Sequence, residues 1–215
     1  MILAGDIGGT KCLLALFEPG GDPRAPRAKQ SLPSRDYRGL VQVVAAYLKE
    51  TGKKVERACF GVPGPVVEGR CETPNLPWVI DARDLRRALA AEITLINDLE
   101  ATGYGVVTLR DDEFFTLSPG RPQPGGNAAL IAPGTGLGEA ILFWDGKQHR
   151  PSASEGGHAS FAPQNALEID LLHHLLEEFD HVSNDRLLSG SGLVRIYKFL
   201  RKRGYAEEPD WLKQE

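Results

Sequence analysis

Gly5-Asp6-Ile7-Gly8-Gly9-Thr10-Lys11 is the stretch on which the interpretation of the fold depends. Apolar runs lie on both sides of it, at residues 2–4 and 12–17, and they predict two strands joined by a tight glycine turn. The same arrangement recurs at Gly134-Thr135-Gly136-Leu137-Gly138, which also lies between two apolar runs. The sequence therefore predicts two strand–turn–strand units that are far apart in the chain.

Glycine-rich turns of this kind can bind phosphate, because their backbone N–H groups point at one spot and no side chain blocks the ligand. Neither turn has the GxxxxGK[ST] pattern of a Walker loop or the spacing of a dinucleotide-binding turn. For either turn alone an ordinary hairpin is the favoured interpretation, whereas the pair, one with Asp6 and one with Thr135, favours phosphate. Asp6 is placed to hold Mg²⁺ through water, since Mg²⁺ keeps much of its hydration.

Strands alternate with helices along the first half of the chain, which indicates an α/β sheet. The next helix is predicted by Leu40, Val43, Val44 and Tyr47, which repeat at the spacing of one helical face, with Gly52 as its C-terminal cap. Further strands are predicted over residues 55–62 and 93–96, with an Asp81-capped helix between them. The segment 68–78 is either a lid or an ordinary loop pinned by its prolines.

The predicted strand 93–96 ends at Asn97 and Asp98. In α/β sheets, ligands bind at the carboxyl ends of strands. An Asp in that position can accept the proton of a hydroxyl group during phosphoryl transfer. The alternative is an N-cap for the following helix, because Asn and Asp are preferred caps. On these residues alone the cap is favoured.

A change of composition after Leu109 marks the predicted domain boundary. Acidic residues are followed there by a segment, Ser118–Gly126, that holds three prolines and three glycines. We therefore expect two domains, residues 1–109 and 110–215. Helical spacing in the second domain predicts two apolar faces, formed by Leu172, Leu175, Leu176 and Phe179 and by Leu193, Ile196, Tyr197 and Leu200.

The sequence Ser154-Glu155-Gly156-Gly157-His158 places a carboxylate three residues before an imidazole. Glu-x-x-His is also half of a di-iron motif, but that motif requires a helix, and two central glycines argue against one. A carboxylate and an imidazole held by a glycine turn can bind hydroxyl groups. A solvated surface loop is the equally good alternative.

Composition excludes several classes of protein. The 215 residues carry 25 Lys and Arg against 29 Asp and Glu, a formal net charge of −4, whereas a general nucleic-acid binder is normally basic. No run is apolar enough to span a membrane, and an acid at position 6 does not fit a signal peptide. Three cysteines with no CxxC pair argue against disulfides or a zinc site. We expect a reduced, cytoplasmic protein without nucleic-acid or membrane partners.

Together these motifs resemble the bacterial glucokinase family, within the sugar kinase–actin–chaperone ATPase superfamily. The resemblance extends over nearly the whole chain, with its motifs in family order. The motifs are Gly5–Thr10, Gly61-Val62-Pro63-Gly64-Pro65-Val66, Asn75-Leu76-Pro77-Trp78, Ile96-Asn97-Asp98, Gly134–Gly138, Glu155–His158 with Phe161-Ala162-Pro163, and Leu188-Ser189-Gly190-Ser191-Gly192-Leu193.

The resemblance implies an α/β, ribonuclease H-like (actin-like ATPase) two-domain sugar kinase that phosphorylates glucose at its 6-hydroxyl with ATP and Mg²⁺, as a homodimer. Its catalytic base would be Asp98. Its sugar-binding residues would be Asn97, Asp98, Glu155, His158 and Asp185. Its phosphate-binding residues would be Gly8, Gly9, Thr10, Gly134, Thr135 and Gly136, with Asp6 near the metal.

The chain departs from the family pattern in two ways. The family usually has Glu where this chain has Asp185, which affects the preference for glucose. Family members also continue past residue 215, so we expect a fragment whose large domain is incomplete and which exposes apolar surface. The alternatives are therefore a weak or inactive sugar-binding fragment, and a kinase for another hexose or an amino sugar.

Overall fold

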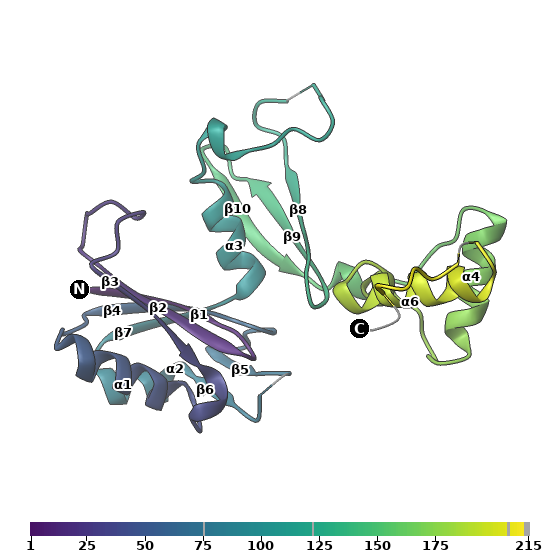
Figure 1. The fold of residues 1–215 in the computed structure, drawn as a ribbon. Coiled ribbons are helices and arrows are strands. Elements are labelled where there is room, and N and C mark those ends of the chain that lie inside the picture. Colours follow the sequence, from purple (N-terminus) through teal and green to yellow (C-terminus); the bar gives the residue numbers. More distant parts are fainter. Residues whose placement is uncertain (75, 122, 206, 213–215) are drawn as a thin grey trace. The chain divides into compact units, whose positions relative to one another are not determined.

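The computed structural model describes residues 1–74, 76–121, 123–205 and 207–212 and divides the chain into two compact units, Met1–Phe115 and Thr116–Glu215 (Figure 1). Asn75, part of one motif above, lies outside the described residues. The division falls after Phe115 instead of after Leu109. Arg24 explains the difference, because it forms an ion pair with Glu113 at 2.9 Å and thereby ties this segment to the first unit.

The first unit is built on a mixed sheet with the strand order β3-β2-β1-β4-β7. β1, β2 and β3 are antiparallel, whereas β1, β4 and β7 are parallel. The predicted hairpin around the first glycine turn is confirmed as β1 and β2. The strands are β1 (Ile2–Ile7), β2 (Lys11–Phe17), β3 (Ala28–Pro33), β4 (Arg57–Val62) and β7 (Glu92–Asn97).

Helices cover both faces of this sheet. α1 (Leu40–Thr51) and α2 (Ala82–Leu89) lie on one face, and α3 (Asp98–Val106) lies on the other (Figure 1). All four apolar residues predicted for the first helix are buried on α1. The helix ends at Gly52, whose φ of 62° is the left-handed conformation that glycine adopts without strain.

A short hairpin of β5 (Arg70–Glu72) and β6 (Val79–Asp81) leads into α2. The segment 68–78 spans this hairpin, and Leu76 and Trp78 are only 8% and 3% exposed. These two side chains are therefore packed into the core, as expected of a pinned loop. The predicted cap of α2 is confirmed, since Asp81 accepts the N–H of Arg83 at 2.8 Å.

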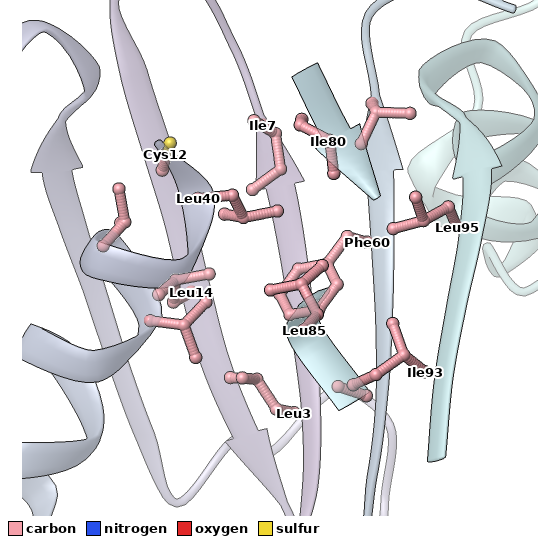
Figure 2. Packing of buried hydrophobic residues seen from close by; sticks show 14 of the residues in the cluster. Leu3, Ile7, Cys12, Leu14, Leu40, Phe60, Ile80, Leu85, Ile93 and Leu95 are labelled. Atoms are coloured by element: carbon pink, nitrogen blue, oxygen red, sulfur yellow. The ribbon is translucent and has the colours of Figure 1, made fainter. Parts of the chain in front are cut away.

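The core of the first unit lies between the sheet and the helices α1 and α2. Figure 2 shows Leu14 of β2 and Phe60 of β4 in the same cluster as Leu40 of α1 and Leu85 of α2. All of these side chains are at most 3% exposed. Burial of this kind supplies the main stabilising free energy of a fold.

The second unit contains an antiparallel sheet and a helical part. The second predicted strand–turn–strand unit is confirmed as β8 and β9, to which β10 adds, in the order β10-β9-β8. Its elements are β8 (Ala128–Pro133), β9 (Leu137–Trp144), β10 (His149–Ser154), the 3₁₀ turn η3 (Gly156–His158), α4 (Ala166–Leu176), α5 (Asn184–Leu187) and α6 (Gly190–Lys202).

The second unit leaves much apolar surface exposed. One sheet face carries Ile131, Ile141 and Phe143, which are 63%, 51% and 53% exposed. The predicted helix faces are wrong at Leu176 and Leu193, which are 47% and 68% exposed. Helical spacing shows that apolar residues share a stripe, but the neighbouring elements decide which part of it is covered.

No helix in the described part of the chain is long and apolar enough to cross a membrane.

We predict that Phe60→Ala destabilises the first unit by about 3–5 kcal/mol, the usual cost of deleting a buried ring. The ring is fully buried. Chemical denaturation measures the loss, and Phe115→Ala is the matched control because that ring is 86% exposed. Equal effects of the two substitutions would contradict the packing described above.

Candidate active site

Two predicted site residues, Asp6 and Asp98, lie at the same edge of the first unit's sheet. β1, β4 and β7 run parallel, so their carboxyl ends meet at one edge. The register places Asp6 opposite Gly61 of β4, and Val62 of β4 opposite Asn97 of β7. Asp98 follows as the first residue of α3.

Asp6 and Asp98 also lie on the same face of this sheet. Gly5 faces the core side chains, and successive residues of a strand face opposite sides, so Asp6 faces the side covered by α3. A Cβ atom on Gly61 would lie 3.1 Å from the Cβ of Ala101 and 3.7 Å from the Cα of Asp98. The missing side chain thus lets α3 approach and places Asp98 beside the strand that pairs with Asp6.

Asn97 is the N-cap of α3, so the alternative considered from sequence is confirmed for this residue. Its Oδ1 accepts the N–H of Leu99 at 2.9 Å, and its Nδ2 donates to the carbonyl of Gly64 at 3.1 Å. The Oδ1 of Asp98 accepts the same Leu99 N–H at 2.9 Å. The positive end of the helix dipole stabilises the negative charge of this carboxylate. Asn97 therefore positions Asp98 as well as capping the helix.

The first glycine turn is held by a residue that the sequence analysis missed. Ser34 is fully buried; its hydroxyl donates to the carbonyl of Gly8 at 2.7 Å, and its N–H donates to the carbonyl of Thr10 at 3.0 Å. The turn is closed by the Gly8 N–H, which donates to the carbonyl of Lys11 at 3.0 Å. Ser34 is 26 residues from Gly8 in the chain, so no local pattern marks it.

A buried thiol completes this anchor. The Sγ of Cys12 lies 3.3 Å from the Oγ of Ser34. Because the single hydroxyl hydrogen of Ser34 is directed to Gly8, the thiol donates to the serine oxygen. Burial raises the pKa of Cys12, so the thiol keeps the proton that this hydrogen bond needs at neutral pH.

The second glycine turn is held from two sides within the second unit. The Leu137 N–H donates to Oδ1 of Asp185 at 2.6 Å, and the Gly190 N–H donates to the carbonyl of Gly134 at 2.9 Å. Asp185 lies on α5 and Gly190 begins α6. The resemblance gave Asp185 a role at the sugar, and the structure shows its carboxylate bonded to the turn.

Glu155 and His158 lie side by side, next to the same turn. His158 Nε2 is 3.6 Å from Glu155 Oε2, and both side chains are about two-thirds exposed, at 66% and 67%. The segment between them is one 3₁₀ turn and not an α-helix, as its two glycines predicted. A Cβ atom on Gly157 would collide with the carbonyl oxygen of Leu137. This close approach seats the carboxylate–imidazole pair against the start of β9.

Hydrogen bonds join this pair to the segment that carries Asp185. The Asn184 N–H donates to the carbonyl of Ala159 at 3.0 Å, and the Phe161 N–H donates to the carbonyl of Val182 at 2.9 Å. Backbone hydrogen bonds therefore hold the segment after His158 beside the segment that carries Asp185, within the second unit.

The carboxylates of the first unit fit a hydrated Mg²⁺ better than an ion enclosed by protein ligands. Among the described residues, no three His, Cys, Asp or Glu side chains gather closely enough to hold a metal ion. Mg²⁺ is usually bound by one or two carboxylates, with water and substrate phosphates as its other ligands. Asp6 is exposed at the end of a strand, beside a glycine turn, and fits that pattern.

This fold, with its glycine turns, defines the class of the chain: an α/β sugar-kinase fold of the actin-like ATPase type. A crystal structure of a glucokinase from an Antarctic psychrotroph is similar, with a TM-score of 0.80 and 30% identity, over 97% of this chain and 67% of that one. A ROK family glucokinase from Streptomyces griseus, solved with glucose and AMPPNP, shares the fold, with a TM-score of 0.57 and 20% identity over 94% of this chain and 61% of that one.

Sequence comparison shows the family. A family model described as glucokinase matches residues 3–214. The glucokinase of Nostoc sp. is 42% identical over 214 residues, which make up 97% of this chain and 63% of that protein. The chain belongs to the glucokinase family. It spans 63% of the length of this curated relative.

We predict that Ser34→Ala loosens the first glycine turn and costs about 1–3 kcal/mol, because the partly buried carbonyl of Gly8 loses its donor. Amide hydrogen exchange at residues 8–11 reports the loosening, and urea denaturation reports the stability. Ser31→Ala, at an exposed position of the preceding strand, is the control. Equal stability and exchange in the two variants would show that Ser34 does not hold the turn.

Stability is expected to fall as the pH rises above the ordinary thiol pKa. Burial is the main cause of raised pKa values at Cys12, Cys59 and Cys71, and the charge of Asp98 adds to it at Cys71. As the pH rises, the thiols of the unfolded chain lose their protons before those of the folded chain. The stability that the buried, protonated thiols provide below about pH 8.5 is therefore lost at higher pH. Urea denaturation at pH 7.5 and 9.5 measures the loss, which should be smaller in Cys12→Ala. An identical pH dependence in that variant would contradict the assignment.

Proposed function

We propose that this chain carries the catalytic residues of an ATP-dependent glucose kinase that phosphorylates the 6-hydroxyl, with Asp98 as the general base. The observation that carries the proposal is the placement of Asp98 at the N-terminus of α3, on the same sheet face as Asp6 and at the edge that holds the first glycine turn. A carboxylate in that position can take the hydroxyl proton, and phosphoryl transfer otherwise needs mainly positioning and charge stabilisation.

Each unit by itself carries groups that can bind the hydroxyl groups of a sugar. Asn97 keeps one amide hydrogen and one oxygen lone pair after its two bonds to the backbone. Glu155 offers a carboxylate acceptor, and His158 offers a ring nitrogen that donates or accepts. The sugar contact that the resemblance implies for Asp185 would use the part of its carboxylate that does not hold Leu137.

Each glycine turn by itself can bind phosphate, and the resemblance assigns both turns to ATP. The first turn supplies Gly8, Gly9 and Thr10 and is kept in shape by Ser34. The second supplies Gly134, Thr135 and Gly136. Mg²⁺, held near Asp6 through water, would supply positive charge at the phosphates. The structure solved with glucose and AMPPNP shows that a protein of this fold binds both kinds of ligand.

Three free cysteines support the expected reducing, cytoplasmic location. The homodimer implied by the resemblance stays a prediction, which light scattering of the purified chain would test.

The exposed apolar face of the second unit supports a second candidate function, sugar binding without turnover. Ile131, Ile141 and Phe143 lie open on the sheet, and the buried apolar cluster of this unit is small. A unit with so little buried apolar area can bind a ligand and still hold its turns too loosely for catalysis. Glucose would then stabilise the chain against unfolding without ADP being formed.

The deciding measurement is ADP formation by the purified chain with glucose, ATP and Mg²⁺. The Asp98→Asn variant is assayed under the same conditions. Removing a general base lowers kcat by about 10²–10⁴-fold, and glucose binding should largely survive. Asp36→Asn, an exposed aspartate of the same unit, controls for the loss of charge. Normal turnover by Asp98→Asn would rule out the assigned base, and glucose binding with no ADP in the unaltered chain would favour the second candidate.

The sugar itself is tested by a panel of substrates under the same conditions. We expect glucose to be the best acceptor. A higher kcat/KM for mannose or N-acetylmannosamine would identify a kinase for another sugar.

A further inference from the structure

The carboxylate of Asp185 lies directly against the second glycine turn. Its Oδ1 accepts the Leu137 N–H at 2.6 Å, across 48 residues of chain. A hydrogen bond with a charged acceptor is about twice as strong as a neutral one. Leu137 is the first residue of β9, and it immediately follows the residues proposed to bind phosphate. A group that fixes this N–H therefore fixes the end of the phosphate-binding turn.

Gly136 lies directly against this carboxylate. A Cβ atom added to Gly136 would collide with Oδ1 of Asp185, and the three nearest atoms to that Cβ all belong to Asp185. Gly136 is not among the glycines with positive φ, so its backbone accepts an ordinary residue. A side chain at this position would therefore have to displace the Asp185 carboxylate, whereas the φ angle of the turn would accept it.

Asp185 is itself held firmly. The N–H of the preceding Asn184 donates to Ala159, and Leu187, one half-turn further on, is 3% exposed. Gly192 of α6 packs so closely on the carbonyl of Leu187 that a Cβ atom would collide with it. Asp185 thus projects from a short helix that is fixed on both sides, as a positioning group must be.

We propose that Asp185 is a positioning residue, which fixes the second glycine turn through the Leu137 N–H so that the turn is shaped for the phosphates of the nucleotide. The identity of the ligand rests on the proposed function, whereas the role of Asp185 in holding the turn does not. This role is separate from the sugar contact that the resemblance implies for Asp185, since the group it orders would bind the nucleotide.

The first test follows the turn itself by amide hydrogen exchange of the full chain, resolved by NMR. In Asp185→Ala, exchange at Leu137 should rise about tenfold or more, because the N–H loses a charged acceptor. Asp185→Asn should largely restore protection, since its amide oxygen accepts the same N–H. Asp180→Ala, which removes an exposed aspartate of the same unit, is the charge control. Unchanged exchange at Leu137 in Asp185→Ala would overturn the proposal.

The second test separates the two ligands by calorimetry with MgADP and with glucose. In Asp185→Ala we expect the Kd for MgADP to rise about tenfold, whereas the Kd for glucose reports separately on the sugar contact implied for the same carboxylate. Loss of glucose affinity with unchanged MgADP affinity would overturn the proposal and assign Asp185 to the sugar. If the unaltered chain bound no MgADP, the proposed function would fail, and the exchange at Leu137 would still decide whether Asp185 holds the turn.

A double-mutant cycle tests the geometry. In the unaltered chain, Gly136→Ala should weaken MgADP binding because the new methyl group displaces the Asp185 carboxylate. In a chain that already carries Asp185→Ala, no carboxylate is left to displace, so Gly136→Ala should have little further effect. Full additivity of the two substitutions would show that Gly136 and Asp185 act independently, against the proposal.

Discussion

The site of the first unit depends on the close approach of α3 to the sheet at Gly61. A side chain there would meet Ala101 and the backbone of Asp98, and it would push the start of α3 away from the strand that pairs with Asp6. Since protein interiors are close-packed, such a shift cannot be absorbed by neighbouring voids. The distance between the two acidic groups is therefore set by a missing side chain on β4, which takes no part in the chemistry itself.

Both glycine turns depend on a side chain that lies far away in the sequence. Glycine lets a ligand approach the backbone, but a glycine-rich turn loses much conformational freedom when it is ordered. Each turn here is ordered by a side chain from a distant segment, the first by Ser34 and the second by Asp185. Ser34 is a neutral, fully buried donor, whereas Asp185 is a charged acceptor. The first turn is thus held by a side chain that donates a hydrogen bond to its backbone, and the second by a side chain that accepts one.

The sequence predicted local features well and tertiary ones poorly. The two hairpins, the buried face of α1 and the caps at Asp81 and Asn97 follow from spacing and residue type within a few positions. Ser34 could not be found in that way, because its role arises only when β3 pairs with β2 and brings it to Gly8. Leu193 was expected to be buried and is exposed, since periodicity does not show which elements cover a helix. β10 was missed because its polar sequence has little strand character.

The arrangement of charges also explains why the two carboxylates of the first unit would have different tasks. Like charges on one face repel each other, and each needs its own stabilising partner. Asp98 stands at the N-terminus of α3, where the Leu99 N–H and the helix dipole stabilise its negative charge. Asp6 lies at the exposed end of a strand, and strands have only a small net dipole. A hydrated cation is the partner that best suits Asp6, which is why we place Mg²⁺ there and the general base at Asp98.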